Sequence, residues 1–189
     1  MAASDEAELV RMINTSTEIN DRPCAFRYPR GTGLGSTLPS INEKIEIGKS
    51  KIIKEGKKLA ILNFGARLSE TLKAAENLLK KGVPITVVDA RFAKPLDENL
   101  IWQLATTHEA IMTIEEGSIG GFGSHVVNFL TKKGLMDSNL KFRSLTLPDI
   151  FIDQDTPENM YKIANLDAYS IEEKVLDLLN SNIVLQKQK

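Results

Sequence analysis

The sequence predicts an α/β protein: a three-layer α/β/α domain with a mostly parallel, mixed five-stranded sheet. Two observations support this prediction. From about residue 40 onward, short apolar runs alternate with segments of helical periodicity at the spacing of βαβ units. The apolar runs have no polar face, as expected of strands that helices cover on both sides. Residues 1–35 add one helix and one strand, which are too little to bury a core alone.

The first 42 residues are predicted to be the end of a preceding domain and a linker. A helix over residues 4–19 is indicated by Ser4 as its cap, by acidic residues in its first turn and by apolar residues that share one face. The run "CAFRY" is predicted to be a short strand. From Thr32 to about Ile41 the sequence is polar and rich in glycine, serine and proline, which is typical of an interdomain linker, and the linker is assigned to residues 36–42. Because residues 1–35 would have lost their partner, we expect their apolar side chains to be partly exposed.

The domain itself is predicted to span residues 43–182, followed by a disordered tail at 183–189. Glycines close several of its elements, as Gly82 does for a helix that carries leucine and alanine at helical spacing. The segment 44–56 is expected to hold one or two short strands. The other predicted strands are 59–65, 84–90, 110–116 and 141–147, and the predicted helices are 66–82, 96–108, 122–134, one from Pro157 and one over 170–179.

Composition excludes several classes of function. The formal net charge of −1 argues against general nucleic-acid binding, which depends on clustered lysine and arginine. No apolar run approaches the roughly 20 residues that span a bilayer, and the first residues lack the pattern of a secretory signal. One cysteine suits the reducing cytoplasm, and two histidines with one cysteine argue against a nitrogen–sulfur metal site. A protein of the cytoplasm without nucleic-acid or membrane partners is expected.

Four stretches carry a resemblance to a known family. The runs "FRYPRG", "DARFAKPLD", "IEEGSIGGFGSH" and "LPDIFIDQDTPE" resemble the C-terminal part of the 1-deoxy-D-xylulose-5-phosphate synthases, thiamine-diphosphate enzymes of the transketolase superfamily. The resemblance covers residues 4–181. "KPLD" occurs widely in transketolase-type C-terminal domains, whereas "RYPRG" together with "EEGSIGGFGSH" is more specific to the synthases.

The resemblance implies a function for the parent protein. Such synthases condense pyruvate with D-glyceraldehyde 3-phosphate, release carbon dioxide and form 1-deoxy-D-xylulose 5-phosphate, a precursor of isoprenoids, thiamine and pyridoxal. They use thiamine diphosphate and Mg²⁺, held by domains that precede this one, and a homodimer is expected. Residues 1–35 would then end the pyrimidine-binding second domain. The chain carries neither a magnesium motif nor a candidate cofactor glutamate, so we expect it to be inactive alone, without catalytic or metal-binding residues.

Arg30 is the candidate site residue, because the resemblance implies that the last arginine of "YPRG" binds the substrate phosphate. A guanidinium is always charged and can bond two phosphate oxygens at once. The alternative is an arginine that bonds backbone carbonyls or makes a surface ion pair. Arg27 and Tyr28 are candidates for a supporting role, although a structural ion pair is favoured for Arg27 and a packed position with a bonded hydroxyl for Tyr28.

The glycine-rich turn at 117–123 is a second candidate, either for anion binding or for packing on another domain or subunit. Gly117, Gly120, Gly121 and Gly123 follow a strand and open a helix, where backbone N–H groups can hold an anion. The spacing of a dinucleotide fingerprint is absent, which favours packing. Glu115 and Glu116 are expected on opposite faces rather than as an acid–base pair. The alternatives to the synthase are therefore a stand-alone anion- or nucleotide-binding module and a dimerisation module.

Overall fold

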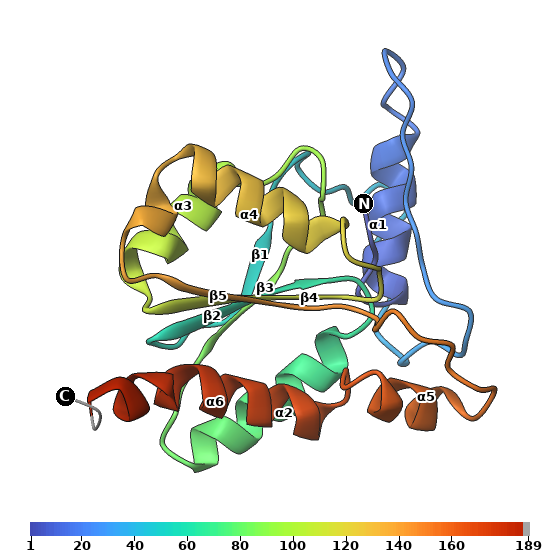
Figure 1. The fold of residues 1–189 in the computed structure, drawn as a ribbon. Helices are drawn as coiled ribbons and strands as arrows, with labels where there is room; N and C mark the ends of the chain where they lie inside the picture. Colours follow the sequence, from blue (N-terminus) through green and yellow to red (C-terminus); the bar gives the residue numbers. More distant parts are fainter. Residues whose placement is uncertain (187–189) are drawn as a thin grey trace.

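A mixed five-stranded sheet lies between two layers of helices in the computed structural model, which describes residues 1–186 (Figure 1). The strands run in the order β1-β3-β2-β4-β5, with β1 antiparallel to β3 and all other neighbours parallel. Their bounds are β1 Lys51–Lys54, β2 Leu59–Phe64, β3 Thr86–Asp89, β4 Ala110–Glu115 and β5 Lys141–Leu145. The predicted fold class is confirmed, and segment 44–56 holds one strand.

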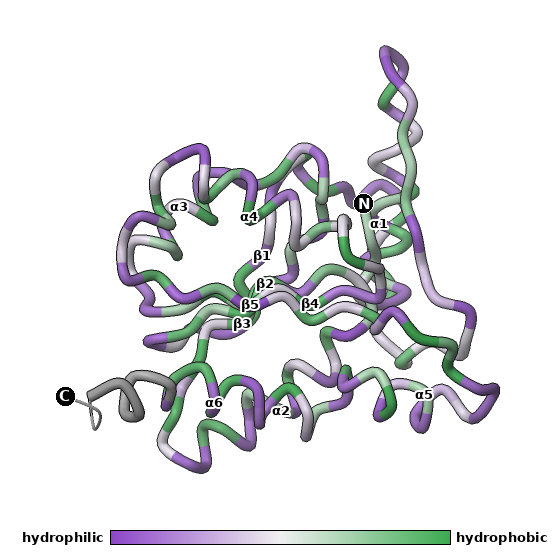
Figure 2. Tube along the Cα trace, in the orientation of Figure 1, coloured by the Kyte–Doolittle hydropathy of each residue, from purple (hydrophilic) through white to green (hydrophobic). Residues whose placement is uncertain are grey.

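The helices divide between the two faces of the sheet. Helices α2 (Leu68–Lys80), α5 (Pro157–Ile163) and α6 (Ala168–Gln186) lie on one side. On the other side lie α3 (Glu98–Thr107), α4 (Phe122–Lys132) and the short 3₁₀ helix η1 (Leu135–Asp137), as Figure 1 shows. Figure 2 shows hydrophobic residues in the sheet and in both helical layers. No helix among residues 1–186 is long and apolar enough to cross a membrane.

Alternation along the buried strands produces two separate cores. Leu59 and Ile61 of β2 pack in the cluster that includes α2 and α6, whereas Ala60 and Leu62 pack in the cluster of α3 and α4. All six residues of β2 and all six of β4 are buried. Burial on both faces explains why these strands are continuous apolar runs in the sequence.

Helix α1 (Glu6–Ser16) stands beside one end of the sheet and is shorter than predicted (Figure 1). The predicted cap is wrong: Asp5 caps the helix, its Oδ1 accepting the Glu8 N–H at 2.7 Å. Ser4 instead donates its hydroxyl hydrogen to Asp89 Oδ2 at 2.6 Å. The Ser4 hydroxyl is engaged by β3 through this tertiary bond, and the capping position passes to the next residue, Asp5.

The predicted exposure of residues 1–35 is correct only in part. Met12 is fully buried in a small third cluster with Ala3, Ile45 and Phe92, so the inner face of α1 packs on the α/β domain. Leu34, in contrast, is 63% exposed. The predicted strand "CAFRY" is wrong, because it forms only one isolated parallel bridge, between Ala2 and Arg27.

The C-terminal helix extends further than predicted. Helix α6 runs to Gln186, so the tail predicted from residue 183 falls partly on this helix and partly on residues 187–189, which lie outside the described residues.

Strand order creates a crevice at one edge of the sheet. The chain leaves β2 through α2 to reach β3, then returns through α3 past β2 to reach β4. The carboxyl ends of β2 and β4 therefore flank a topological switch point, which is where open α/β sheets bind ligands.

Candidate functional site

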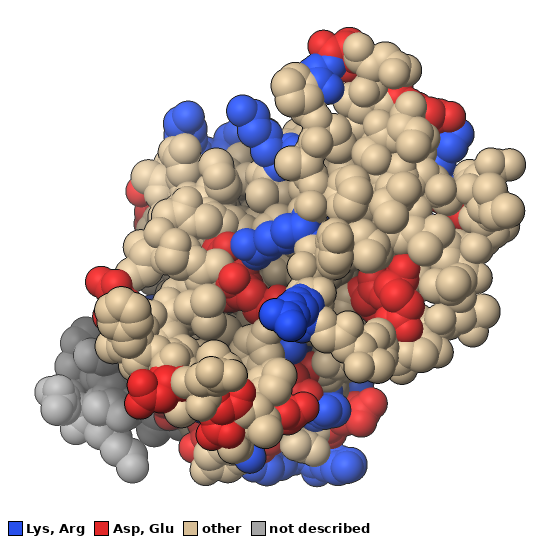
Figure 3. Space-filling model, turned by 90° about the vertical axis from the view of Figure 1, so that its right-hand side faces the viewer, with Lys and Arg blue, Asp and Glu red and all other residues tan. Residues whose placement is uncertain are grey.

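A cavity of about 480 Å³ lies at this switch point. Gly65 and Ala66, directly after β2, and Glu116, directly after β4, line it on the side of the sheet. The extended segment 27–30 lines another side, and residues of α5 and of the preceding loop line a third, namely Leu147, Ile152, Pro157, Met160 and Tyr161. Figure 3 views this end of the molecule, where charged side chains lie scattered over a mostly uncharged surface.

Arg30 lines the cavity and is exposed to solvent. No ion pair or hydrogen bond joins its guanidinium to another residue in the described part of the chain. All five N–H groups of this side chain are therefore available to an anion in the cavity. The alternative interpretation of Arg30 was a surface ion pair or hydrogen bonds to backbone carbonyls, and neither is found among residues 1–186.

Arg27 occupies a different environment three residues earlier. Its guanidinium lies over the Phe64 ring, 4.9 Å from the centroid, and its Nη2 is 3.7 Å from Glu115 Oε2. The favoured structural pair for Arg27 is therefore found, with a half-exposed side chain that still reaches the cavity. The packed position predicted for Tyr28 is wrong: this side chain is 62% exposed and lines the cavity, because residue 28 lies outside any strand.

A polar triad of Glu116, Tyr161 and Arg67 lies at the cavity, which the first two of these residues line. Glu116 Oε1 is 2.9 Å from Arg67 Nε and accepts the hydrogen of the Tyr161 hydroxyl. The Arg67 guanidinium also stacks on the Tyr161 ring, 3.5 Å from its centroid. Burial and the hydrogen bond to Glu116 raise the pKa of Tyr161 to about 12. The triad joins α5, which has no buried residue, to the ends of β2 and β4.

Comparison with known proteins identifies the fold family. The model of the family "Transketolase, C-terminal domain" matches residues 48–171, from just before β1 into α6. This chain belongs to that family. It is also similar to a solved structure described as "Split gene transketolase, inactive beta4 tetramer", with 28% sequence identity and a TM-score of 0.67. That match covers 77% of this chain but only 46% of the other, so the chain spans less than half the length of this structural neighbour.

In this transketolase C-terminal domain, the glycine-rich turn at 117–123 wraps around a side chain of the protein itself. Glu115 is 1% exposed, and its Oε1 accepts the Gly123 N–H at 2.9 Å. A Cβ at Gly117 or Gly121 would lie 2.5 or 2.4 Å from Glu115 Oε2. Gly120 has a φ of +101° and open space around it. Close approach to a carboxylate thus accounts for Gly117 and Gly121.

This arrangement bears on the anion-binding interpretation of the turn. The Gly123 N–H is already bonded, and the carboxylate beneath the turn repels a second anion. Packing remains the better interpretation, and Ile119 at the tip of the turn is 82% exposed. Glu115 contacts Arg27 and the Gly123 N–H. Glu116 contacts Arg67 and Tyr161. They form no acid–base pair, as predicted.

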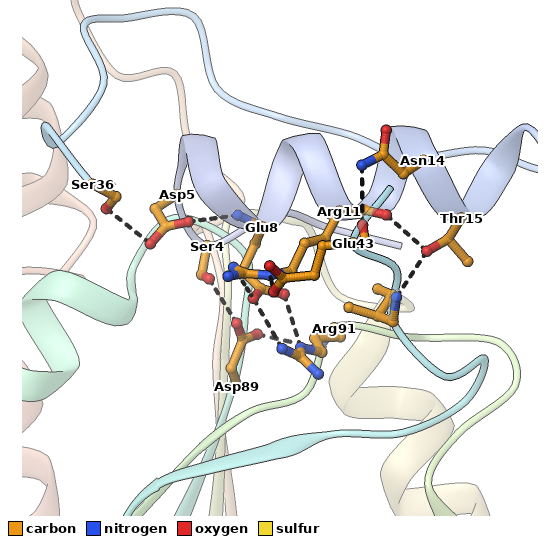
Figure 4. Close-up of polar contacts among 11 residues, drawn as sticks. Ser4, Asp5, Glu8, Arg11, Asn14, Thr15, Ser36, Glu43, Asp89 and Arg91 are labelled. Carbon is orange, nitrogen blue, oxygen red and sulfur yellow. Dashed lines mark hydrogen bonds and ion pairs between the residues drawn. The ribbon is translucent and has the colours of Figure 1, made fainter. Parts of the chain in front are cut away.

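A buried polar network fastens α1 to the domain (Figure 4). Glu8 Oε2 lies 2.9 Å from Arg91 Nε and Glu8 Oε1 lies 3.0 Å from Arg11 Nη1, and the Glu8 side chain is 6% exposed. Arg91 follows β3, and its ion pair with Glu8 joins this end of the sheet to α1. Desolvation raises the pKa of Asp89 to about 6, against the lowering effect of the Ser4 hydroxyl.

Three other titratable residues occupy structural positions at the ends of helices. His108 Nε2 lies 2.8 Å from Thr86 Oγ1, and burial lowers the pKa of this imidazole. His125 lies in the first turn of α4, where its backbone N–H donates to the Gly121 carbonyl. Asp155 accepts the Thr156 N–H at 2.6 Å, in the turn beside the cap of α5, which is Thr156. Within residues 1–180, no group of three His, Cys, Asp or Glu side chains could hold a metal ion.

Proposed function

We propose that this chain is the C-terminal part of a thiamine-diphosphate-dependent synthase that condenses pyruvate with D-glyceraldehyde 3-phosphate. The products are 1-deoxy-D-xylulose 5-phosphate and carbon dioxide. The family match supports a transketolase-type enzyme, and "RYPRG" with "EEGSIGGFGSH" supports the synthase within that superfamily. The observation that carries the proposal is Arg30, an unpaired and exposed cation at a cavity on the switch point of the sheet.

The cofactor belongs to another part of the proposed enzyme. Full-length members of the transketolase family depend on thiamine diphosphate and a metal ion. Residues 1–180 offer no group of carboxylates and imidazoles for the metal, so they do not fit this cofactor. In our proposal, residues 1–35 end the pyrimidine-binding domain, residues 36–42 are the linker, residues 43–182 form the C-terminal domain, and the cofactor domains precede them. The chain alone is then inactive.

The contribution proposed for this chain is to bind the acceptor substrate. The Arg30 guanidinium can donate two parallel N–H bonds to the phosphate of D-glyceraldehyde 3-phosphate. Because this phosphate does not react, its binding energy can hold the aldehyde in place for attack. Arg27, fixed over Phe64, adds positive potential on the same side of the cavity. Apolar side chains such as Leu147 and Ile152 exclude water from the other side.

The test is Arg30→Ala in the enzyme reassembled with its cofactor domains. We expect the KM for D-glyceraldehyde 3-phosphate to rise about 10- to 100-fold, with the KM for pyruvate changed less than about twofold, because only the first substrate carries a phosphate. Arg22→Ala is the matched control. Arg22 is an exposed arginine of the same segment that pairs with Asp21 and does not line the cavity. Equal changes for both substrates in Arg30→Ala would contradict a phosphate-binding role.

A homodimer located in the cytoplasm completes the proposal. The structural neighbour is described as a tetramer, and this chain presents apolar side chains of its own for association. Phe151 is fully exposed and Ile150 is 61% exposed, both in the loop between β5 and α5 beside the cavity. Exposed apolar groups of this kind mark interaction surfaces.

A further inference from the structure

The loop that carries Arg30 is fixed at its downstream end by one carboxylate. Glu6, in the first turn of α1, accepts three successive backbone N–H groups: Leu34 at 3.0 Å, Gly35 at 2.6 Å and Ser36 at 2.8 Å. Gly33 packs on the same carboxyl group, since a Cβ there would lie 2.9 Å from Glu6 Cδ. Successive N–H groups that converge in this way form a concave seat for an anion, and here the anion is Glu6.

The upstream end of the loop is fixed by the first residues of the chain. The Arg27 N–H donates to the Met1 carbonyl at 3.1 Å, and the Ala3 N–H donates to the Arg27 carbonyl at 3.1 Å. The Arg27 side chain adds its contact with Phe64. Both anchors of the loop thus come from residues 1–6 and the domain on which they pack.

Between the two anchors the loop has few contacts of its own. Residues 28–32 are exposed, and Arg30 has no polar partner within the described residues. The position of the guanidinium therefore depends on where the two anchors hold the backbone. We propose that Glu6 is a positioning residue for Arg30: its carboxylate holds the backbone of residues 34–36 and thereby keeps the guanidinium at the cavity. This inference rests on the proposed phosphate-binding role of Arg30.

The length of loop that Glu6 closes sets the expected effect. With the anchors in place, six residues, 28–33, lie between Arg27 and the first bonded amide. Without Glu6, and without the bond from the Ser36 hydroxyl to Asp5, the next fixed point is Glu43, whose carbonyl accepts from Asn14. The free loop then grows to residues 28–42. Loop closure probability falls with the 3/2 power of length, so the Arg30 position is populated about fourfold less.

The experiment uses the 189-residue chain with inorganic phosphate as the probe. Nuclear relaxation of the Arg30 side-chain Nε–H reports its mobility, and titration reports the affinity for phosphate. We expect Glu6→Ala combined with Ser36→Ala to increase Arg30 mobility and to weaken phosphate binding about fourfold. Glu6→Gln, which keeps one acceptor oxygen and is less disruptive to folding, should produce a smaller change in the same direction.

Glu70→Ala is the matched control. Glu70 also lies in the first turn of a helix and also accepts a backbone N–H, that of Ala168 at 3.1 Å, but this amide belongs to α6 and not to the Arg30 loop. It should leave both readouts unchanged. Unchanged Arg30 mobility in both Glu6 variants would overturn the positioning inference, even if phosphate binds. Phosphate binding that is weakened in Arg30→Ala but unchanged in both Glu6 variants would also overturn it. If the unaltered chain binds no phosphate, this result counts against the proposed function, and the comparison of Arg30 mobility alone then decides the positioning inference.

Discussion

The ion pair between Arg91 and Glu8 offers a direct test of how α1 is attached. Both side chains are largely buried, 12% and 6% exposed, and two contacts of 2.9 Å join them. Removing one partner of such a pair leaves the other charge buried and costs about 3–5 kcal/mol. Because Arg11 stays 3.0 Å from Glu8, we expect Arg91→Ala to cost about 2–3 kcal/mol.

Native-state hydrogen exchange measures this cost where it arises. If α1 opens locally, the loss of 2–3 kcal/mol should speed exchange of α1 amides about 30- to 150-fold, since a factor of ten corresponds to about 1.4 kcal/mol. The amides of β2 and β4 should change far less. Lys73→Ala is the control, because Lys73 belongs to an exposed pair and should change exchange little. An acceleration in α1 below about threefold would refute the buried-pair reasoning.

Two further predictions concern the glycine-rich turn and Asp89. Gly121→Ala should lower the free energy of unfolding, measured by urea denaturation, by about 1–3 kcal/mol, because its Cβ would lie 2.4 Å from Glu115 Oε2. The control is Gly31→Ala, which should change the free energy of unfolding little because nothing lies within 4 Å of its Cβ. Equal effects of the two substitutions would contradict this account. Asp89 has a pKa raised to about 6 by burial, so the folded state favours its protonated form, and stability should fall by roughly 2–3 kcal/mol as pH rises from about 4 past 6. Burial lowers the pKa of His108, so the contribution of this imidazole to stability rises with pH instead of falling. The contribution of Asp89 is isolated by the difference in the free energy of unfolding between the unaltered chain and Asp89→Asn, measured from pH 4 to 8. A difference that does not change with pH would disprove the prediction for Asp89.

The α/β domain could be predicted from sequence because its strands are buried on both faces. Continuous apolar runs such as residues 59–64 have no other common explanation when helical periods separate them. The N-terminal segment was harder to predict. Its bonds go to residues far along the chain, as Ser4 bonds to Asp89, and no local pattern contains that information.

The candidate site divides in the same way. A sequence motif was enough to single out Arg30 and to separate it from Arg27, but it gave no sign of the triad around Glu116. That triad brings together residues of α5, of the end of β4 and of the start of α2, which only the fold places together. The glycines at 117 and 121 could be located but not explained, because the group they approach, Glu115, was expected to be one of two ordinary strand-end acids.

The attachment of α5 has a consequence for redesign of this protein. This helix has no buried residue and is joined to the domain through Tyr161 and the loop before it, while Met160 and Ile152 face the cavity. Substitutions of Met160 alter the size and polarity of the cavity without touching either hydrophobic core, whereas Ile152 also packs against the cluster of α2 and α6. For the proposed acceptor site, larger or smaller acceptors can therefore be sought by mutating Met160 on this short surface helix, at little expense in folding.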